Sequence, residues 1–213
     1  MIGKLGNVAE NIPKVYASGY ETGYSMGNEA GKQAEYNDFW DTYQSNGNRK
    51  NYNAFFQRAG WKNGSTYKPK YPIECTANNY ASNMFLYSGI SDTLIPITIT
   101  GSHLSVFNGS AVVTIPHLDI SGVTANINDW FTGCTELASI TIVGTIPVSI
   151  NFKDCPLTAK SLVNIVEHLS DTASGKTLTV KSSAVSNADW STTEYESWDA
   201  LIATKSNWSF SLA

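Results

Sequence analysis

One short pattern, Phe-x-x-Ser or Phe-x-x-Cys, recurs along the sequence at a nearly constant spacing. Its copies are Phe85/Ser88, Phe107/Ser110, Phe131/Cys134 and Phe152/Cys155. The phenylalanines lie 22, 24 and 21 residues apart. A fixed period of about 20 to 50 residues is the signature of a solenoid, in which each repeat forms one turn that packs only on its neighbours. We therefore expect the large and the small side chain of every repeat to line one continuous core.

Short segments of alternating Ile, Val, Leu and Thr lie between and after these repeats. They occupy residues 97–100, 115–120, 139–142 and 177–180. Alternation with a period of two predicts strands that are buried on one face only, with Ile99, Ile120, Ile142 and Val180 pointing inward. The expected fold is an α/β solenoid, a short and irregular leucine-rich-repeat-like stack of parallel strands with an N-terminal helix and a C-terminal α/β cap.

The segments before and after the repeats differ from them in sequence pattern, so we predict four parts. These are an N-terminal helical segment (1–45), an aromatic-rich cap (46–74), the solenoid (75–181) and a C-terminal cap (182–213). The aromatic segment either covers the first turn or forms a carbohydrate-stacking platform. A helical apolar face over residues 162–169 follows Thr158, a good N-cap residue. A second helix is expected over residues 192–204, with Trp198, Leu201 and Ile202 pointing inward, and a strand is expected over 208–212.

In the N-terminal segment, tyrosine and glycine each recur at every fourth position. Such spacing places two stripes along a helix, and each glycine costs a helix about 1 kcal/mol relative to alanine. Close packing against another helix would offset that cost. We therefore expect this segment to contact a second copy or another protein; the alternative is a flexible tether with a chance periodicity. The stripe residues are Tyr16, Gly19, Tyr20, Gly23, Tyr24 and Gly27.

The distribution of charged residues limits the classes of partner that the chain is expected to bind. The net charge is −4, and no Lys or Arg occurs between Tyr71 and Phe152. Proteins that bind phosphate backbones need clustered cations, so nucleic acid is not an expected partner of this region. No run of about 20 apolar residues predicts a membrane span. No secretory signal is visible, and the odd number of cysteines favours folding in a reducing cytoplasm.

The titratable residues form no recognisable catalytic or metal-binding constellation, so we expect no enzyme, no cofactor and no metal. His117 and Asp119 lie two residues apart on one predicted strand, where a general base beside a carboxylate is conceivable. Chance exposure on a polar sheet is the alternative that we favour.

A row of exposed polar side chains is the candidate binding surface, because strands stacked about 4.8 Å apart would align them. Such a hydroxyl-rich surface suits a saccharide or a protein, although threonine is also simply a good exposed strand residue. The candidates are Thr98, Thr100, His117, Asp119, Ser121, Thr141, Thr179 and Lys181. Alternation places Thr98, Asp119, Thr141 and Thr179 in one row, with Thr100, Ser121, Val143 and Lys181 beside it.

Several runs resemble a family of proteins encoded by phages and prophages of gut Firmicutes. They are Tyr-Asn-Asp-Phe-Trp-Asp-Thr-Tyr-Gln-Ser-Asn-Gly-Asn-Arg at residues 36–49, Tyr-Lys-Pro-Lys-Tyr at 67–71, Ile-Asn-Phe-Lys-Asp-Cys-Pro-Leu at 150–157 and Lys-Ser-Asn-Trp at 205–208. The resemblance covers roughly residues 30–213.

Members of this family carry leucine-rich repeats similar to BspA-type surface repeats. The resemblance implies a tail- or baseplate-associated virion protein, assembled in the host cytoplasm, that contacts another virion protein, a host-surface protein or a glycan. A secreted BspA-like cell-surface adhesion module is the alternative.

Overall fold

A computed structural model describes residues 52–53, 55–59, 69, 72–76, 78, 80–93 and 95–213. The predicted N-terminal helix and its tyrosine and glycine stripes, from Tyr16 to Gly27, lie outside these residues, as does most of the predicted aromatic cap.

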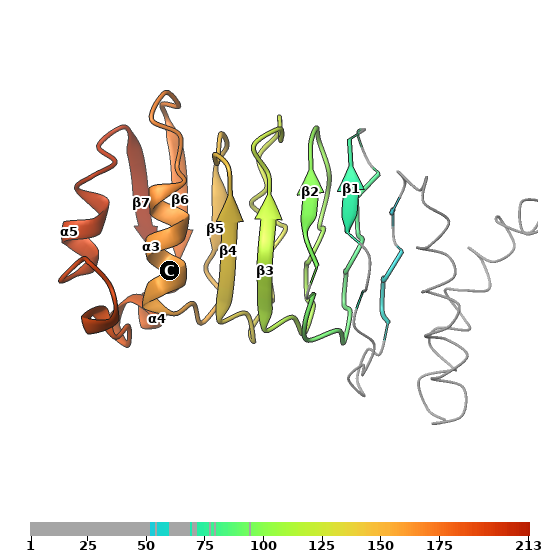
Figure 1. The fold of residues 1–213 in the computed structure, drawn as a ribbon, viewed down its shortest axis with the longest axis horizontal. Coiled ribbons are helices and arrows are strands. Elements are labelled where there is room, and N and C mark those ends of the chain that lie inside the picture. The colour runs from blue at the N-terminus through green and yellow to red at the C-terminus, as the bar shows by residue number, and fades with distance from the viewer. Residues whose placement is uncertain are drawn as a thin grey trace, which may run out of the picture.

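The described chain forms a solenoid of parallel strands, and Figure 1 shows the strands side by side along its long axis. One four-stranded sheet contains β1 (Ile73–Cys75), β2 (Ile97–Ile99), β3 (Thr114–Asp119) and β4 (Ser139–Val143). A three-stranded sheet contains β5 (Ile150–Phe152), β6 (Lys176–Val180) and β7 (Trp208–Leu212). All pairings within both sheets are parallel, as a coil that adds strands turn by turn requires.

The repeated phenylalanines form a single column through the core, which confirms the main prediction from their spacing. The rings of Phe85, Phe107, Phe131 and Phe152 stack with successive centroid distances of 5.1, 5.4 and 4.6 Å and interplanar angles of 5°, 9° and 27°. Phe56 extends the column at 4.9 Å from Phe85, a member that the sequence analysis assigned to the cap. The small partners Ser88, Ser110, Cys134 and Cys155 are all buried, as expected.

Backbone hydrogen bonds join successive turns beside this column, outside the strands. The N–H of Phe56 donates to Met84 O at 2.8 Å and that of Phe85 to Val106 O at 2.7 Å. The N–H of Phe107 donates to Trp130 O at 3.1 Å. Because these bonds satisfy buried backbone groups, the irregular corners remain ordered without being strands.

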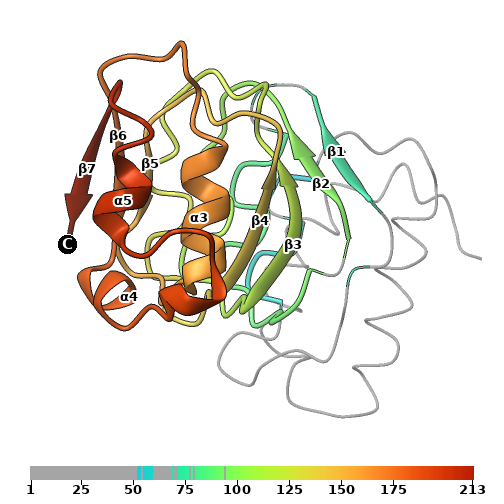
Figure 2. The ribbon, with the colours of Figure 1, turned by 60° about the vertical axis from the view of Figure 1, so that its left-hand side comes forward.

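Helix α3 (Ala159–Glu167) takes the position of a further strand beside β4 (Figure 2). Thr158 caps the helix, its side chain accepting a hydrogen bond from the N–H of Ser161, and Leu162, Ile165, Val166 and Leu169 are buried. Both features confirm the sequence prediction. The helix covers the edge of β4 that would otherwise expose unpaired backbone groups.

Side chains of α3 replace the missing strand by hydrogen bonding to β4. Ser161 Oγ accepts from the N–H of Ile140 at 3.1 Å and donates to Ala138 O at 3.3 Å. Asn164 accepts from the N–H of Ile142 through Oδ1 at 2.6 Å and donates to Ile142 O through Nδ2 at 3.4 Å. The edge of the first sheet is therefore satisfied by a hydroxyl and an amide.

The C-terminal region contains α4 (Ser182–Ser186), the 3-10 helix η1 (Trp190–Thr192), α5 (Trp198–Ile202) and β7. The predicted continuous helix over 192–204 is wrong, because Thr193 is extended, with φ −127° and ψ 174°. Ser197 then starts a new helix by accepting a hydrogen bond from Ala200 N–H. The inward placement of Trp198 and Leu201 is confirmed, since both are buried.

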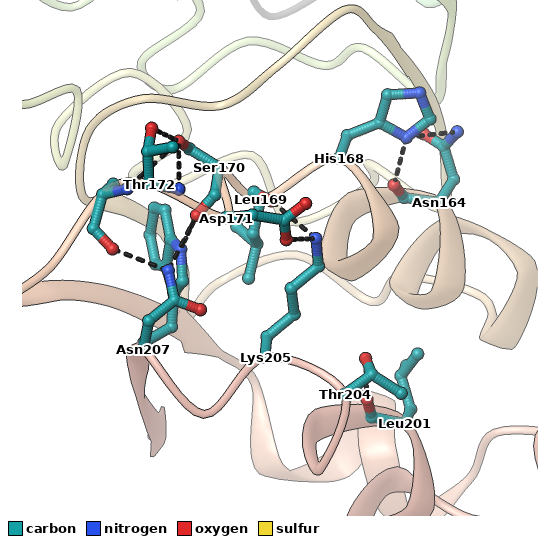
Figure 3. Close-up of polar contacts among 12 residues, drawn as sticks. Asn164, His168, Leu169, Ser170, Asp171, Thr172, Leu201, Thr204, Lys205 and Asn207 are labelled. Carbon is teal, nitrogen blue, oxygen red and sulfur yellow. Dashed lines mark hydrogen bonds and ion pairs between the residues drawn. The ribbon is translucent and has the colours of Figure 1, made fainter.

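The Lys-Ser-Asn-Trp run at residues 205–208 fastens β7 to the loop after α3 (Figure 3). Lys205 Nζ donates to Leu169 O at 2.8 Å, Trp208 Nε1 to Ser170 O at 2.9 Å, and Asn207 Nδ2 to the same carbonyl at 2.9 Å. The Asp171 carboxylate that pairs with Lys205 is exposed, so the salt bridge adds little. This run therefore has a structural role, which is to satisfy loop carbonyls.

Candidate functional site

The outer face of the four-stranded sheet carries the strand face, which we define as the exposed and half-buried side chains of β1 to β4 that point away from the core. Glu74, Thr98 and Asp119 lie in consecutive registered positions on β1, β2 and β3. Val143 follows Asp119 in the same row on β4. The predicted neighbouring of Thr98 and Asp119 is confirmed.

A β-bulge in β3 determines which residues of β3 and β4 lie side by side in a second part of the strand face. Ile115 pairs with Ile140 and Leu118 with Ile142, so Pro116 and His117 together oppose the single residue Thr141. Proline has no N–H to give to a ladder and is tolerated at such a bulge. The bulge keeps Ile115 and Leu118 buried on both sides of the irregularity and brings His117 beside Thr141. Thr141 therefore lies beside His117 instead of in the row of Thr98 and Asp119.

Two predicted members of the surface lie elsewhere. Thr179 belongs to β6, where it is registered with Asn151 of β5 and Ser211 of β7, and Lys181 follows β6. Both residues thus lie on the second sheet, away from Thr98. The prediction assumed one strand per turn, whereas the chain forms both β4 and β5 within the same turn. The strand face accordingly excludes Thr179 and Lys181.

Hydrogen bonds fix the end of the strand face where β3 finishes. Asp119 Oδ1 accepts from the N–H of Ser121 at 3.0 Å and from its hydroxyl at 2.7 Å. Thr100, just after β2, is half-buried, and its N–H donates to Cys75 O at 2.9 Å. The carboxylate of Asp119 is thereby directed toward Ser121, and among the described residues no hydrogen bond joins it to His117.

The strand face presents two carboxylates and several hydroxyls, with no lysine or arginine on β1 to β4. Glu74 and Asp119 flank Thr98, about 10 Å apart at the usual strand spacing. Hydroxyls donate and accept hydrogen bonds and carboxylates accept them, so both can bind polyhydroxylated groups and both can accept from cationic groups. This arrangement suits recognition of a polar surface and repels a phosphate backbone.

One histidine and two aspartates of the repeats hold neighbouring turns together. Buried His103 accepts through Nδ1 from the N–H of Ala81 at 3.0 Å, and its Nε2 lies 2.7 Å from Thr100 O. Asp129 Oδ2 accepts from Ser105 Oγ at 2.7 Å, and Asp154 Oδ2 accepts from Gly133 N–H at 2.8 Å. The contacts of His103 Nδ1, Asp129 and Asp154 each join neighbouring turns, and sequence reasoning missed all three.

The cysteines are free and buried. Burial raises the pKa of the Cys75 thiol to about 12 and that of Cys134 to about 11, and it raises the pKa of Cys155 too. A thiol is a poor nucleophile until it is deprotonated. Within the described part of the chain, no group of three or more His, Cys, Asp and Glu side chains could hold a metal ion.

A shallow hollow of about 330 Å³ lies between α3 and the loop after η1. Partial burial raises the pKa of Glu167 at its rim, and the neighbouring carboxyl of Glu194 raises it further through a hydrogen bond and charge repulsion. The Tyr195 hydroxyl donates to Glu167 Oε1 at 3.4 Å. The hollow thus carries two carboxyl groups, as the strand face does, but Lys160 lies beside them. Its lining consists of Lys160, Val163, Asn164, Glu167, Thr192, Thr193 and Glu194.

Comparison with known proteins gives no match to a family model, to a curated protein or to a solved structure. Among the helices of the described residues, none has the length and apolar character needed to cross a membrane.

Proposed function

We propose that the chain is a non-enzymatic structural and binding component of a phage particle, associated with the tail or baseplate. In this proposal the solenoid is leucine-rich-repeat-like, the strand face contacts a host-surface glycan or a protein, and the N-terminal segment attaches the chain to itself or to another virion protein. The resemblance of the runs at 36–49, 67–71, 150–157 and 205–208 to phage-encoded proteins supports the location.

The observation that carries the binding role is the registered row of Glu74, Thr98 and Asp119 on a sheet whose opposite side forms the core. Strands hold these side chains at fixed spacing, so little conformational entropy is lost when a ligand binds. The groups that might have supported catalysis, such as His103 and the thiols, are instead buried in contacts between turns. Both observations favour a binding surface over a reaction centre.

Co-sedimentation with isolated cell walls of a Firmicute tests the binding role. The wild-type chain should sediment with the walls, and Thr98→Lys should reduce the bound fraction at least tenfold, because it places a bulky cation between Glu74 and Asp119. Thr179→Lys is the matched control, since it makes the same change on the second sheet, and it should bind like wild type. Equal binding by both variants, or none by the wild type, would overturn the role of the strand face.

Fractionation of phage particles tests the location. Particles are induced from a strain that encodes the chain and banded on a density gradient, and an antibody against the chain is applied to the fractions. The proposal expects the chain to band with the particles. Recovery only from the particle-free supernatant or from the bacterial surface would contradict it and would favour the adhesion module.

A further inference from the structure

The two sheets end in different ways at the C-terminal end of the solenoid. The edge of β4 is covered by α3, whose Ser161 and Asn164 bond to its backbone. β7 is the edge strand of the second sheet, with β6 on one side and no described strand on the other. Exposed edges are sites where another strand can pair, and proteins that do not use them generally block them.

The outward backbone groups of β7 follow from its pairing with β6. Ala213 N–H donates to Val180 O at 3.0 Å, and Ala213 O accepts from Ser182 N–H at 2.8 Å. Since backbone groups alternate in direction along a strand, the N–H and C=O of Phe210 and Leu212 point away from β6. Among the described residues, no hydrogen-bond partner lies on that side of Phe210 or Leu212.

The core columns also end at this edge. Registered pairing continues the phenylalanine column from Phe152 to Val180 and then to Leu212. Phe152 and Val180 are 0 % exposed, whereas Leu212 is 51 % exposed. A parallel row runs from Leu178 to Phe210, which is half-buried. One more strand with apolar residues two positions apart would bury both row ends, as each earlier strand buries the previous one.

We propose that the edge of β7 is a docking site for a single extended segment of a partner protein, which adds to the second sheet as one further strand. The segment pairs with the N–H and C=O of Phe210 and Leu212 and places apolar side chains against them. Ser209 and Ser211 lie on the exposed side, and β7 has no charged residue, so the segment needs no compensating charge. This inference goes beyond the proposed function, because β7 lies on the other sheet from the strand face.

The position of α5 favours a lone strand over a second copy of the chain. In Figure 1, α5 projects further than β7 along the long axis, and its Trp198 contacts Phe210 edge-to-face at 5.9 Å. Two copies that joined their β7 edges at about 4.8 Å would have to fit both α5 helices in front of the joint. An extended segment brings no helix of its own and so avoids this conflict. Strand addition of this kind is an established mode of peptide recognition.

The test uses the full chain and a defined probe. The probe is the acetylated and amidated peptide Ala-Ser-Ile-Thr-Ile-Val, which copies residues 138–143 and carries isoleucines two positions apart. Its control is the same peptide with N-methyl groups at the threonine and the valine, which keeps the side chains but removes the donors that face β7 when the isoleucines lie against Phe210 and Leu212 in a parallel pairing. We expect millimolar probe to slow amide exchange of Phe210 and Leu212 at least tenfold, and the methylated control to leave it unchanged.

Leu212→Pro separates docking from folding. It removes an N–H that points away from β6, and an edge strand tolerates proline at such a position. The melting temperature should therefore stay within a few degrees of wild type, whereas the probe should no longer slow amide exchange at Phe210. Leu212→Lys keeps the N–H, adds a charge that discourages strand pairing, and should also abolish the effect. Unchanged exchange at Phe210 and Leu212 with the probe would overturn the proposal. So would a concentration-dependent dimer of the wild type that Leu212→Lys dissolves, because the edge would then belong to a second copy.

Discussion

The side-chain amide of Asn164 bonds to both backbone groups of Ile142, accepting from its N–H at 2.6 Å and donating to its carbonyl at 3.4 Å. It thereby does for β4 what the backbone of a neighbouring strand does elsewhere in the sheet. A helix can cover a sheet edge by its bulk alone, but only polar side chains at suitable positions can also satisfy the backbone that it covers.

Asn164→Leu should therefore destabilise the fold. The substitution leaves the N–H and C=O of Ile142 covered by α3 without partners, at a cost of about 1–3 kcal/mol in the free energy of unfolding. Urea titration followed by tryptophan fluorescence measures this cost. Lys160→Leu changes an exposed residue of the same helix and should stay within about 0.5 kcal/mol of wild type. Equal stability of the two variants would show that the amide is dispensable.

Replacing Gly109 is predicted to destabilise the fold, because the ring of Tyr87 lies against it. Gly109 has φ +64°, and a Cβ on it would lie 2.3 Å from Cδ1 of the Tyr87 ring. Gly133 has φ +72°, but its nearest neighbour would be Gly109 Cα at 3.4 Å. Both alanine substitutions incur the cost of the left-handed conformation, about 1 kcal/mol, and Gly109→Ala must also displace a ring.

In thermal unfolding, Gly109→Ala should have a lower melting temperature than Gly133→Ala. Adding Tyr87→Ala should recover part of the loss in the first variant and none in the second, after the effect of Tyr87→Ala alone is subtracted. If the effects of Gly109→Ala and Tyr87→Ala on the melting temperature are strictly additive, the Tyr87 ring is not the cause of the difference between the two glycine variants.

His103 should make stability depend on pH. Burial lowers the pKa of its imidazole, and the hydrogen bond from Ala81 N–H requires Nδ1 to be unprotonated. The folded pKa is below the unfolded value of about 6.5, so the unfolded chain binds the proton first. The stabilisation is complete above pH 6.5 and is lost as the pH falls through the folded pKa.

The measurement compares the free energy of unfolding at pH 7.5 with that at pH 5 for wild type and His103→Gln. The wild type should lose more stability on acidification than the variant does. Glu167 acts in the opposite direction, because its raised pKa favours the folded state at low pH, but it is present in both proteins and cancels from the difference. Identical pH dependence in the two would exclude His103 as the cause.

The thiols should be unreactive in the folded protein. Burial raises the pKa of Cys75 to about 12 and that of Cys134 to about 11, so neither forms thiolate at pH 8. Ellman's reagent should detect no fast-reacting thiol in the native chain and all three after unfolding in urea. A thiol titrated within seconds under native conditions would contradict the buried position of that cysteine.

The sequence predicts those features of the fold that depend only on the spacing of residues along the chain. The phenylalanine column, the Thr158 cap and the inward face of α3 follow from spacing along the chain, and all are confirmed. Phe56 was missed because it precedes Phe85 by 29 residues and is followed by Ala59 in place of Ser or Cys. β5 was missed because three residues are too few to show alternation.

The strand face was predicted in part, and the error has a geometric origin. Alternation shows which side chains leave a sheet, but not to which sheet a strand belongs, so Thr179 was placed with Thr98. Bulges are equally invisible in a pattern of period two, which is why Thr141 was expected beside Asp119 instead of His117. The bond between Asn164 and Ile142 requires knowledge of where the helix packs, which no local pattern supplies.

The aromatic stack has a consequence for how such a chain can vary. The ring centroids are between 4.6 and 5.4 Å apart, although 21 to 29 residues separate the phenylalanines that carry them. Contact between rings thus sets the pitch of the molecule, and the corners take up whatever length of chain remains. Loops of different size and chemistry can be exchanged at those corners while the axis keeps its spacing, so a lineage of such proteins can diversify its outer rim without rebuilding its interior.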